Sequence, residues 1–409
     1  MLNKQHFLVV DDDIEMISFF KIILEKAGHK VTALNSSLEA LAQIEKIKPD
    51  CVISDLMMPD LDGLDLFKKI KLLKNIKQPK FIVVTVKQYE FDRRRATKAG
   101  IDGYVVKPIN ATTFLSEVLA IIEGEMVAQF WGIRGTLPVP GKEAVRYGGN
   151  TNCVTLLLSK KHFFIFDAGS GIKALSTHLM RKATFPISAK IFISHPHYDH
   201  ISGFPFFVPL YMKGNSFQIF GASNDGMGIQ KSLDGQMDSI YFPITMNEFS
   251  ATLSFHNLGE ETFTVDDIVI TTMYLNHPGK CIGYQVKYKN KIFCYVTDNE
   301  IPFENTSAYS QFDIDRLIQF IKDAELLVID ATYTDQEYSK KVFWGHSCIS
   351  RVIDIADKAK VKLVCLFHHD PDQTDNDIDK KVEYAQDLLK QKKSTTVCIA
   401  PREGDMLFI

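Results

Sequence analysis

The first 124 residues alternate short apolar runs with stretches of helical periodicity, and this alternation limits their fold more than any other feature. Five runs are predicted to be strands: HFLVV (6–10), KVTAL (30–34), CVIS (51–54), KFIVVT (80–85) and GYVV (103–106). Between them lie segments with apolar residues at 3.6-residue spacing, such as residues 14–28, which Gly28 closes, and a last helix over 111–124. Five such βα units predict an α/β fold, a doubly wound five-stranded parallel sheet.

Polar residues occur at the ends of these predicted strands. The set comprises Asp11, Asp12, Asp55, Thr85 and Lys107. Because parallel sheets place their sites at the carboxyl ends of the strands, we expect all five on one rim. Three carboxylates together favour Mg²⁺, and Asp55 could then accept a phosphoryl group while Lys107 balances its charge. A single aspartate here could instead be a helix cap, but chance does not readily explain the whole set.

Residues 1–124 resemble the receiver domain of bacterial response regulators, which has a flavodoxin-like fold. The motifs VVDDD, SDLMMPDLDG, VVT and YVVKP carry the resemblance. It implies that Asp55 is the phospho-acceptor, with a sensor histidine kinase as phosphoryl donor. It also implies that Asp11 and Asp12 hold Mg²⁺ with Asp55, and that Thr85 and Tyr104 are the switch pair that responds to the new charge.

Two further residues complete this prediction. Lys107 belongs to the same switch set. Val86 departs from the family pattern, which usually has a small residue after the threonine. We expect the bulky side chain to slow entry or loss of the phosphoryl group.

The composition and the predicted secondary structure change after Gly124, where glycine-rich segments and short predicted strands begin. We therefore expect a second domain over residues 125–409, long enough to bury its own core. The net charge of −3 gives no global indication of nucleic-acid binding.

The cysteines and apolar runs predict a cytoplasmic protein. Seven scattered cysteines without a CxxC motif fit free thiols in a reducing compartment. The N-terminal apolar run is too short for a signal peptide, and no apolar stretch approaches the ~20 residues that span a bilayer, so we expect no membrane association.

The segment SHPHYDH (194–200) places three histidines and an aspartate within seven positions, after a predicted strand. His195 and His197 can point one way while Asp199 and His200 point another, which suits two metals. Burying these groups without a partner would cost several kcal/mol, so metal binding is the favoured interpretation.

A dinuclear site needs further ligands, and candidates lie at the ends of other predicted strands. They are His277 in LNHPG, Asp298 in YVTDNE and His368 in CLFHHD. A lone histidine such as His277 can equally be structural. Imidazole and carboxylate together favour Zn²⁺, with Mn²⁺ or Fe as alternatives.

The HxHxDH pattern and the upstream FIFDAGSG resemble the metallo-β-lactamase superfamily, an αββα sandwich. Further motifs are similar to the branch of tRNase Z and related phosphodiesterases, including cyclic-phosphate hydrolases. These motifs are GIRGTLPVPG, YGGNTNCV, AELLVIDATY, GHS (345–347) and LVCLFHHDP.

The resemblance implies a role for each candidate residue. The first metal would be held by His195, His197 and His277, and the second by Asp199, His200 and His368. Asp298 would bridge the two metals, and Asp167 would orient a ligand from the second shell.

The resemblance also implies that His346 is the general acid of a phosphodiester hydrolysis. The metals would supply a nucleophile at neutral pH, and Asp199 would help to orient it. An alkoxide is a poor leaving group, so a proton donor is needed opposite the nucleophile. A structural histidine packed near Trp344 is the alternative for His346.

The interval 203–276 lacks the glycine-rich basic run of the tRNA-binding arm of tRNase Z, which argues against pre-tRNA. A small or cyclic phosphodiester such as a cyclic nucleotide is favoured instead. The interval contains aromatic, strand-like segments, FPFFVPLYMKG and SIYFPITM. Their aromatic residues could stack on a base or pack in the core: Phe204, Phe206, Phe207, Tyr211 and Tyr241.

Other functions stay open at this point. The same metal frame hydrolyses lactones, thioesters or lactams in some relatives, although GHS and Asp298 argue for phosphodiesters. A non-catalytic signalling scaffold is a third interpretation, opposed by the complete ligand set. For regulation, we expect phosphorylation of Asp55 to alter receiver docking or homodimer contacts.

Overall fold

The computed structural model describes residues 4–86, 95–96, 99–109, 114–123, 126–158, 162–182, 185–223 and 226–409. The chain divides into two compact units, which meet in the sequence between residues 125 and 126. The predicted boundary after residue 124 lies one residue from this division. Residues 124 and 125 themselves are outside the described part of the chain.

The first unit is built on a five-stranded parallel sheet with the strand order β2-β1-β3-β4-β5. This is the flavodoxin-like order of doubly wound folds. The predicted strands are confirmed, and only β3 is one residue longer than expected. The strands are β1 (His6–Val10), β2 (Lys30–Leu34), β3 (Cys51–Asp55), β4 (Lys80–Thr85) and β5 (Gly103–Val106).

Apolar side chains of this sheet enter two separate cores, one on each face. The helices are α1 (Ile14–Lys26), α2 (Ser37–Ile47), α3 (Gly63–Leu72) and α5 (Phe114–Glu123). Asp13 caps α1 by accepting hydrogen bonds from the backbone of Glu15 and Met16. Gly28, with φ +87°, follows its end as predicted. Most of the segment between β4 and β5, where a fourth helix was expected, lies outside the described residues.

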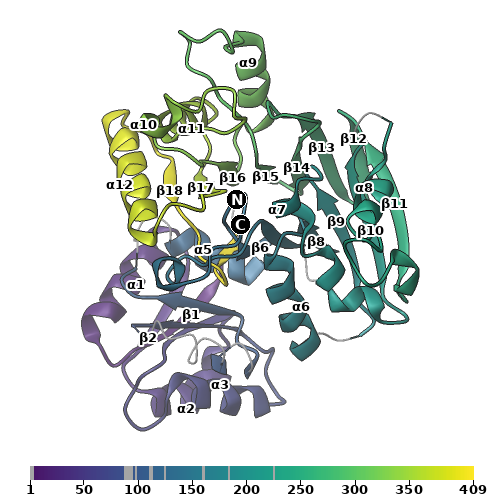
Figure 1. The fold of residues 1–409 in the computed structure, drawn as a ribbon. Helices are drawn as coiled ribbons and strands as arrows, with labels where there is room; N and C mark the ends of the chain where they lie inside the picture. The colour runs from purple at the N-terminus through teal and green to yellow at the C-terminus, as the bar shows by residue number, and fades with distance from the viewer. Residues whose placement is uncertain are drawn as a thin grey trace. The chain divides into compact units, whose positions relative to one another are not determined.

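The second unit contains two seven-stranded sheets (Figure 1). The first has the order β11-β10-β9-β8-β7-β6-β19: β6 (Met126–Gly132), β7 (Cys153–Leu158), β8 (His162–Phe166), β9 (Ser188–Ile193), β10 (Ser216–Ala222), β11 (Thr252–Leu258) and β19 (Met406–Phe408). The second has the order β12-β13-β14-β15-β16-β17-β18: β12 (Thr262–Val265), β13 (Ile268–Tyr274), β14 (Ile282–Tyr288), β15 (Lys291–Val296), β16 (Leu326–Asp330), β17 (Leu363–Phe367) and β18 (Val397–Ile399).

The helices of the second unit connect these strands. They are α6 (Gly171–Lys182), α7 (Tyr198–Ile201), α8 (Ile229–Gly235), α9 (Gln311–Phe320), α10 (Asp335–Tyr338), α11 (Ile349–Lys358) and α12 (Asp375–Gln391). Short 3₁₀ turns cover Lys142–Ala144, Phe204–Phe206, Val208–Tyr211 and Met246–Glu248. Among the described residues, no helix has both the length and the apolar character needed to cross a membrane.

Three apolar cores divide this unit into layers. The central core joins side chains of both sheets, such as Phe166 and Phe192 with Tyr284 and Tyr295. A second core packs α9, α11 and α12 against the outer face of the second sheet, and a third packs α6 and α8 against the first. The layers are therefore α, β, β, α, as predicted.

The prediction of strand-like structure at FPFFVPLYMKG and SIYFPITM is wrong. The first segment forms two 3₁₀ turns with Pro205 and Pro209 as their second residues. Proline disfavours a strand here because it fixes φ and removes a ladder donor. The second forms turns. Phe204 and Phe207 are 0% exposed and belong to the core, so they cannot stack on a base.

The remaining aromatic candidates are more accessible. Phe206 and Tyr241 are 51% and 77% exposed. Tyr211 is half-buried, and its ring packs edge-on against Phe249. Of the five predicted aromatic residues, only these three are accessible enough to stack on a base.

Candidate metal centre

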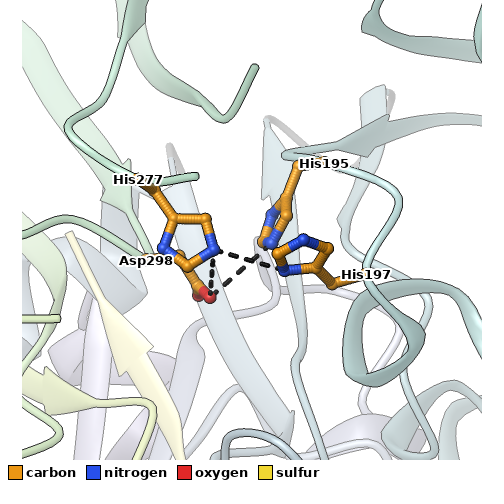
Figure 2. A group of neighbouring side chains, drawn as sticks. All are labelled: His195, His197, His277 and Asp298. Atoms are coloured by element: carbon orange, nitrogen blue, oxygen red, sulfur yellow. Dashed lines mark hydrogen bonds and ion pairs between the residues drawn. The ribbon is translucent and has the colours of Figure 1, made fainter. Parts of the chain in front are cut away.

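Histidine and aspartate side chains from separate loops gather at strand ends of the second unit. Three groups have all their ligand atoms within 4.8 Å of one another. Two of them have four members: His195, His197, His277 and Asp298 form the first group, and Asp199, His200, Asp298 and His368 form the second. The remaining one has three members: Asp330, His346 and His368. Figure 2 shows the first group, in which three imidazoles surround one carboxylate. The structure thus brings together the seven residues predicted as ligands, in the predicted sets, and their role as ligands stays a prediction.

The Asp298 carboxylate lies between the two groups. Its Oδ2 is 3.6 Å from Nε2 of His195 and 3.6 Å from Nε2 of His277. Its Oδ1 is 3.1 Å from Nε2 of His200 and 3.1 Å from Nε2 of His368. Each oxygen therefore faces a different pair of imidazoles, so this one carboxylate is within reach of both groups.

In four of the imidazoles, Nδ1 has a hydrogen-bond partner outside the two groups. The partners are Ser194 Oγ for His195 (3.1 Å), Asp167 Oδ2 for His200 (2.7 Å), the Gly345 carbonyl for His277 (2.9 Å) and Thr332 Oγ1 for His368 (3.0 Å). Such outer partners fix the tautomer of metal-binding histidines and leave Nε2 available as the ligand atom. His197 differs, because its Nδ1 lies 3.2 Å from Nε2 of His277.

These side chains fit a divalent metal pair. Nε2 of His195 is buried without a hydrogen-bond partner, which is costly unless something else binds it. Burial, with the nearby His200, holds the pKa of His195 well below its usual value, so its ring is neutral and offers a lone pair. Imidazole and carboxylate donors in this ratio suit Zn²⁺, Mn²⁺ or Fe.

The charges of the second group are coupled. Burial opposes protonation of His200, but Asp199, Asp298 and Asp167 outweigh it and hold its pKa well above the usual value. Burial likewise opposes ionisation of Asp298, but His368 and His200 outweigh it and hold its pKa well below the usual value. Without a cation, a proton on the imidazoles therefore compensates the buried carboxylates.

The backbone at three of these positions is left-handed. Asp167, Asp298 and His368 follow β8, β15 and β17 with φ of +57°, +41° and +58°. Aspartate and histidine tolerate this region better than most residues, but it remains uncommon and concentrates at functional sites. The turn redirects each side chain from the sheet toward the centre.

Asp199 is a member of the second group, whereas Asp167 lies outside it and contacts one of its imidazoles. Asp167 is fully buried and accepts hydrogen bonds from Ser194 and from the Tyr295 hydroxyl, in addition to its contact with His200. Asp199 Oδ2 accepts from the backbone of Thr136 at 2.8 Å. Asp167 thus supports a predicted ligand from outside, whereas Asp199 is itself in the second group.

His346 lies at the edge of the same centre. Its Nδ1 is 2.8 Å from Asp330 Oδ2, and its ring stacks on that of His368 at 4.8 Å. Burial opposes protonation, but Asp330 raises the pKa of His346 to about 9. The ring is therefore protonated at neutral pH and could donate a proton from Nε2.

Gly135 leaves room for His368. A Cβ at this position would lie 2.2 Å from Cε1 of His368, so the imidazole or the backbone would have to move to make room for it. The motif GIRG is therefore needed for close approach of the backbone to an imidazole.

Substituting Gly135→Ala is expected to displace His368 and lower metal affinity by about 10-fold or more, as for disturbed partners of metal ligands. Chelator competition and thermal unfolding would measure this. Gly235→Ala is the control, because nothing lies within 4 Å of its Cβ, and it should change stability by less than about 1 kcal/mol. Equal metal affinity in both variants would contradict the packing argument.

In the first unit, Lys107 joins two of the predicted acidic residues. Its Nζ is 3.0 Å from Asp11 Oδ2 and 3.1 Å from Asp55 Oδ1. Burial raises the pKa of Asp11 despite this contact. Asp12 is exposed, and Asp11, Asp12 and Asp55 do not form a group with ligand atoms within 4.8 Å among the described residues.

The predicted switch residues lie on neighbouring strands. Thr85 ends β4 and is buried, and Tyr104 is half-buried in β5. Val86, which follows Thr85, is 68% exposed and therefore lies at the surface.

The sequence analysis missed several residues that shape the centre. Asp330 ends β16 as Asp55 ends β3, so the strand-end rule could have identified it. Thr332 and Ser194 have no comparable signal, because a hydroxyl partner depends on the fold. His369, adjacent to His368, is buried away from both groups and contacts Lys381.

Comparison with known families assigns both units. The Response regulator receiver domain family matches residues 7–119. The Beta-lactamase superfamily domain matches residues 162–369, half of the chain. The chain belongs to the beta-lactamase superfamily. Its beta-lactamase superfamily domain follows a receiver domain, and this membership supports a metal-dependent hydrolase.

Two curated relatives each match less than a third of the chain. The alkaline phosphatase synthesis transcriptional regulatory protein PhoP of Bacillus subtilis is 32% identical over 31% of this chain and 52% of its own. The sensory transduction protein RegX3 of Mycolicibacterium smegmatis is 29% identical over 28% of this chain and 49% of its own. The chain thus spans about half the length of these relatives.

A solved structure shows the fold of the beta-lactamase superfamily domain. The metallo-beta-lactamase fold protein YhfI from Bacillus subtilis has a TM-score of 0.50 and 17% identity. The match covers 69% of this chain and 98% of that protein.

Proposed function

We propose that the beta-lactamase superfamily domain is a dinuclear metal-dependent phosphodiesterase for small or cyclic phosphodiesters, such as cyclic nucleotides, and that phosphorylation of Asp55 controls it. The position of the Asp298 carboxylate carries the proposal, because one oxygen faces His195 and His277 while the other faces His200 and His368.

The two ligand groups would hold Zn²⁺, or Mn²⁺ or Fe. When bound, such a pair supplies a nucleophile at neutral pH and neutralises charge on the phosphoryl oxygens. Asp199 orients the attacking water and accepts its proton, while the new P–O bond forms in line with the bond that breaks. His346 gives a proton from Nε2 to the departing alkoxide, so hydrolysis yields a hydroxyl group and a phosphomonoester, on the same molecule when the substrate is cyclic.

Asp330 prepares His346 for this role. The carboxylate accepts from Nδ1, which fixes the ring so that Nε2 is the donating atom. Asp330 is itself held by the backbone of Asn299 and by Thr332, at 2.7 to 3.0 Å. This support argues for a proton donor in a set orientation rather than a histidine that only fills space.

The interval 203–276 has no glycine-rich basic run, which favours a small substrate over pre-tRNA. Its described residues contribute strands β10 to β13 to the two sheets. Phe206 and Tyr241, which are exposed, remain candidates for stacking on a nucleobase.

A substrate panel tests the proposal. Metal-loaded protein would be incubated with cyclic nucleotides, linear dinucleotides, a lactone and a thioester. We expect turnover of phosphodiesters and none of the acyl substrates. Turnover of acyl substrates alone would reject the phosphodiesterase proposal.

For the receiver domain, we propose that a sensor histidine kinase transfers a phosphoryl group to Asp55 with Mg²⁺ bound. Asp55→Asn is expected to reduce labelling by a small phosphoryl donor to background, because an amide is not an acceptor. Asp62→Asn is the control, since asparagine also caps α3. Persistent labelling of Asp55→Asn would place the acceptor elsewhere, and unchanged turnover after labelling would reject control by phosphorylation.

A further inference from the structure

Glu300 lies two residues after Asp298, and its side chain binds a different loop. The residue is only 4% exposed. One carboxylate oxygen accepts from the backbone of Phe343 at 2.9 Å and from the Tyr338 hydroxyl at 2.6 Å, and the other accepts from the backbone of Gly345 at 2.9 Å. A buried carboxylate with three neutral donors fixes those donors strongly.

The backbone of Glu300 is tied to the segment that carries His277. Its N–H donates to the Asn276 carbonyl at 2.8 Å, and the Asn276 side chain donates to the Glu300 carbonyl at 2.9 Å. The main chain of Glu300 therefore fixes the residue before a predicted ligand, while its side chain holds the loop before His346.

The loop that carries His346 also binds the residues immediately before and after Glu300. The Ser347 hydroxyl donates to the Asn299 carbonyl and accepts from the backbone of Ile301 at 3.2 Å. Residues 299–301 and 343–347 thus face each other along their length, with the carboxylate of Glu300 between the two serine contacts in sequence.

Gly345, which Glu300 holds, contacts the candidate metal ligand His277. Its φ is +82°, and its carbonyl accepts from Nδ1 of His277. A Cβ here would lie 2.5 Å from that Nδ1, so the loop packs directly against the imidazole. His346 follows immediately, and its own Nδ1 binds Asp330. One turn therefore presents both the acceptor for His277 and the His346 ring.

We propose that Glu300 is a positioning residue that sets His277 and His346 together, so that a metal ligand and the proton donor keep one fixed spacing. The proposal rests on the function proposed above. Glutamine at this position has a single acceptor oxygen, and its amide would place a donor against a backbone N–H. The turn at 343–345 would then shift, and both histidines would move with it.

Glu300→Gln is expected to weaken one of the two bound Zn²⁺ ions by about 10- to 100-fold in chelator competition. It should also lower turnover of an alkyl phosphodiester more than that of a p-nitrophenyl diester, because only the alkoxide needs the proton from His346. Tyr338→Phe is the matched control. It removes the hydroxyl donor but leaves both backbone donors on the carboxylate, so both quantities should stay near wild type.

The outcomes separate positioning from general support. If Glu300→Gln lowers only the unfolding temperature, and both the Zn²⁺ affinity and the alkyl-to-aryl ratio equal wild type, the proposal is overturned. If Glu300→Gln does not fold, Glu300→Asp replaces it, and an unchanged ratio and affinity there would equally reject the proposal. A wild-type protein that hydrolyses no diester would refute the proposed function, while the Zn²⁺ affinity would still test the link to His277.

Discussion

Asp298→Asn is expected to bind metal more than about 100-fold more weakly than the wild type and to lose measurable turnover, since replacing even an outer partner of a ligand costs 10- to 100-fold. The amide keeps the size of the side chain but removes the negative charge that four imidazoles approach within 3.1 to 3.6 Å. It also removes one of the two oxygens that serve the separate groups.

Thermal unfolding with and without added Zn²⁺ measures this effect directly. A cation at 100 times its Kd stabilises a folded protein by about 2.7 kcal/mol, and we expect this gain in the wild type but not in Asp298→Asn. Asp323→Asn is the control, because Asp323 also has a left-handed backbone (φ +55°) but is exposed. A Zn²⁺-dependent shift of wild-type size in Asp298→Asn would mean that this carboxylate is not a ligand.

His346→Ala is expected to keep both metals and to lose about 10²- to 10⁴-fold in kcat on diesters with alkoxide leaving groups, the usual contribution of a general acid. Turnover of p-nitrophenyl diesters should fall far less, since that leaving group departs without a proton. Metal analysis and kcat on both substrates measure the effect. Intact turnover of the alkyl diester would show that His346 is structural.

The pH profile gives a second test of the same role. Asp330 raises the pKa of His346 to about 9, so the acid is present below that pH and is lost above it. Asp330→Asn should lower this pKa and move the basic limb of the kcat profile to lower pH. A basic limb that does not move in Asp330→Asn would contradict proton donation by His346.

The fold followed from local patterns, because strands buried on one or both faces leave a strong apolar signal. The strands after which His195, Asp298 and His368 stand were predicted for this reason, and strand ends then indicated the candidate ligands. The aromatic residues at 204 and 207 were ambiguous, since an irregular segment has no periodicity that separates core from surface.

The supporting residues of the centre were much harder to predict. Glu300 and Thr332 act through hydrogen bonds to loops 36 to 45 residues away in the sequence. No spacing rule connects such positions, because the contact exists only after two sheets have formed. Gly135 is similar, since its importance depends on the imidazole that approaches it.

In the receiver domain, strand ends identified Asp11, Asp55 and Lys107, which the structure brings together. The exposed side chain of Asp12 was not foreseen. Adjacent residues at a strand end point in different directions, so a shared position in the sequence does not ensure a shared site.

The central claim is that two cations occupy one centre built from separate loops of the beta-lactamase superfamily domain. Elemental analysis of the purified full-length protein, after dialysis against a weak chelator, tests it most directly. We expect two equivalents of transition metal per chain in the wild type and a marked loss in Asp298→Asn. A wild-type protein that retains no transition metal and takes up none from Zn²⁺ or Mn²⁺ solutions would contradict the claim.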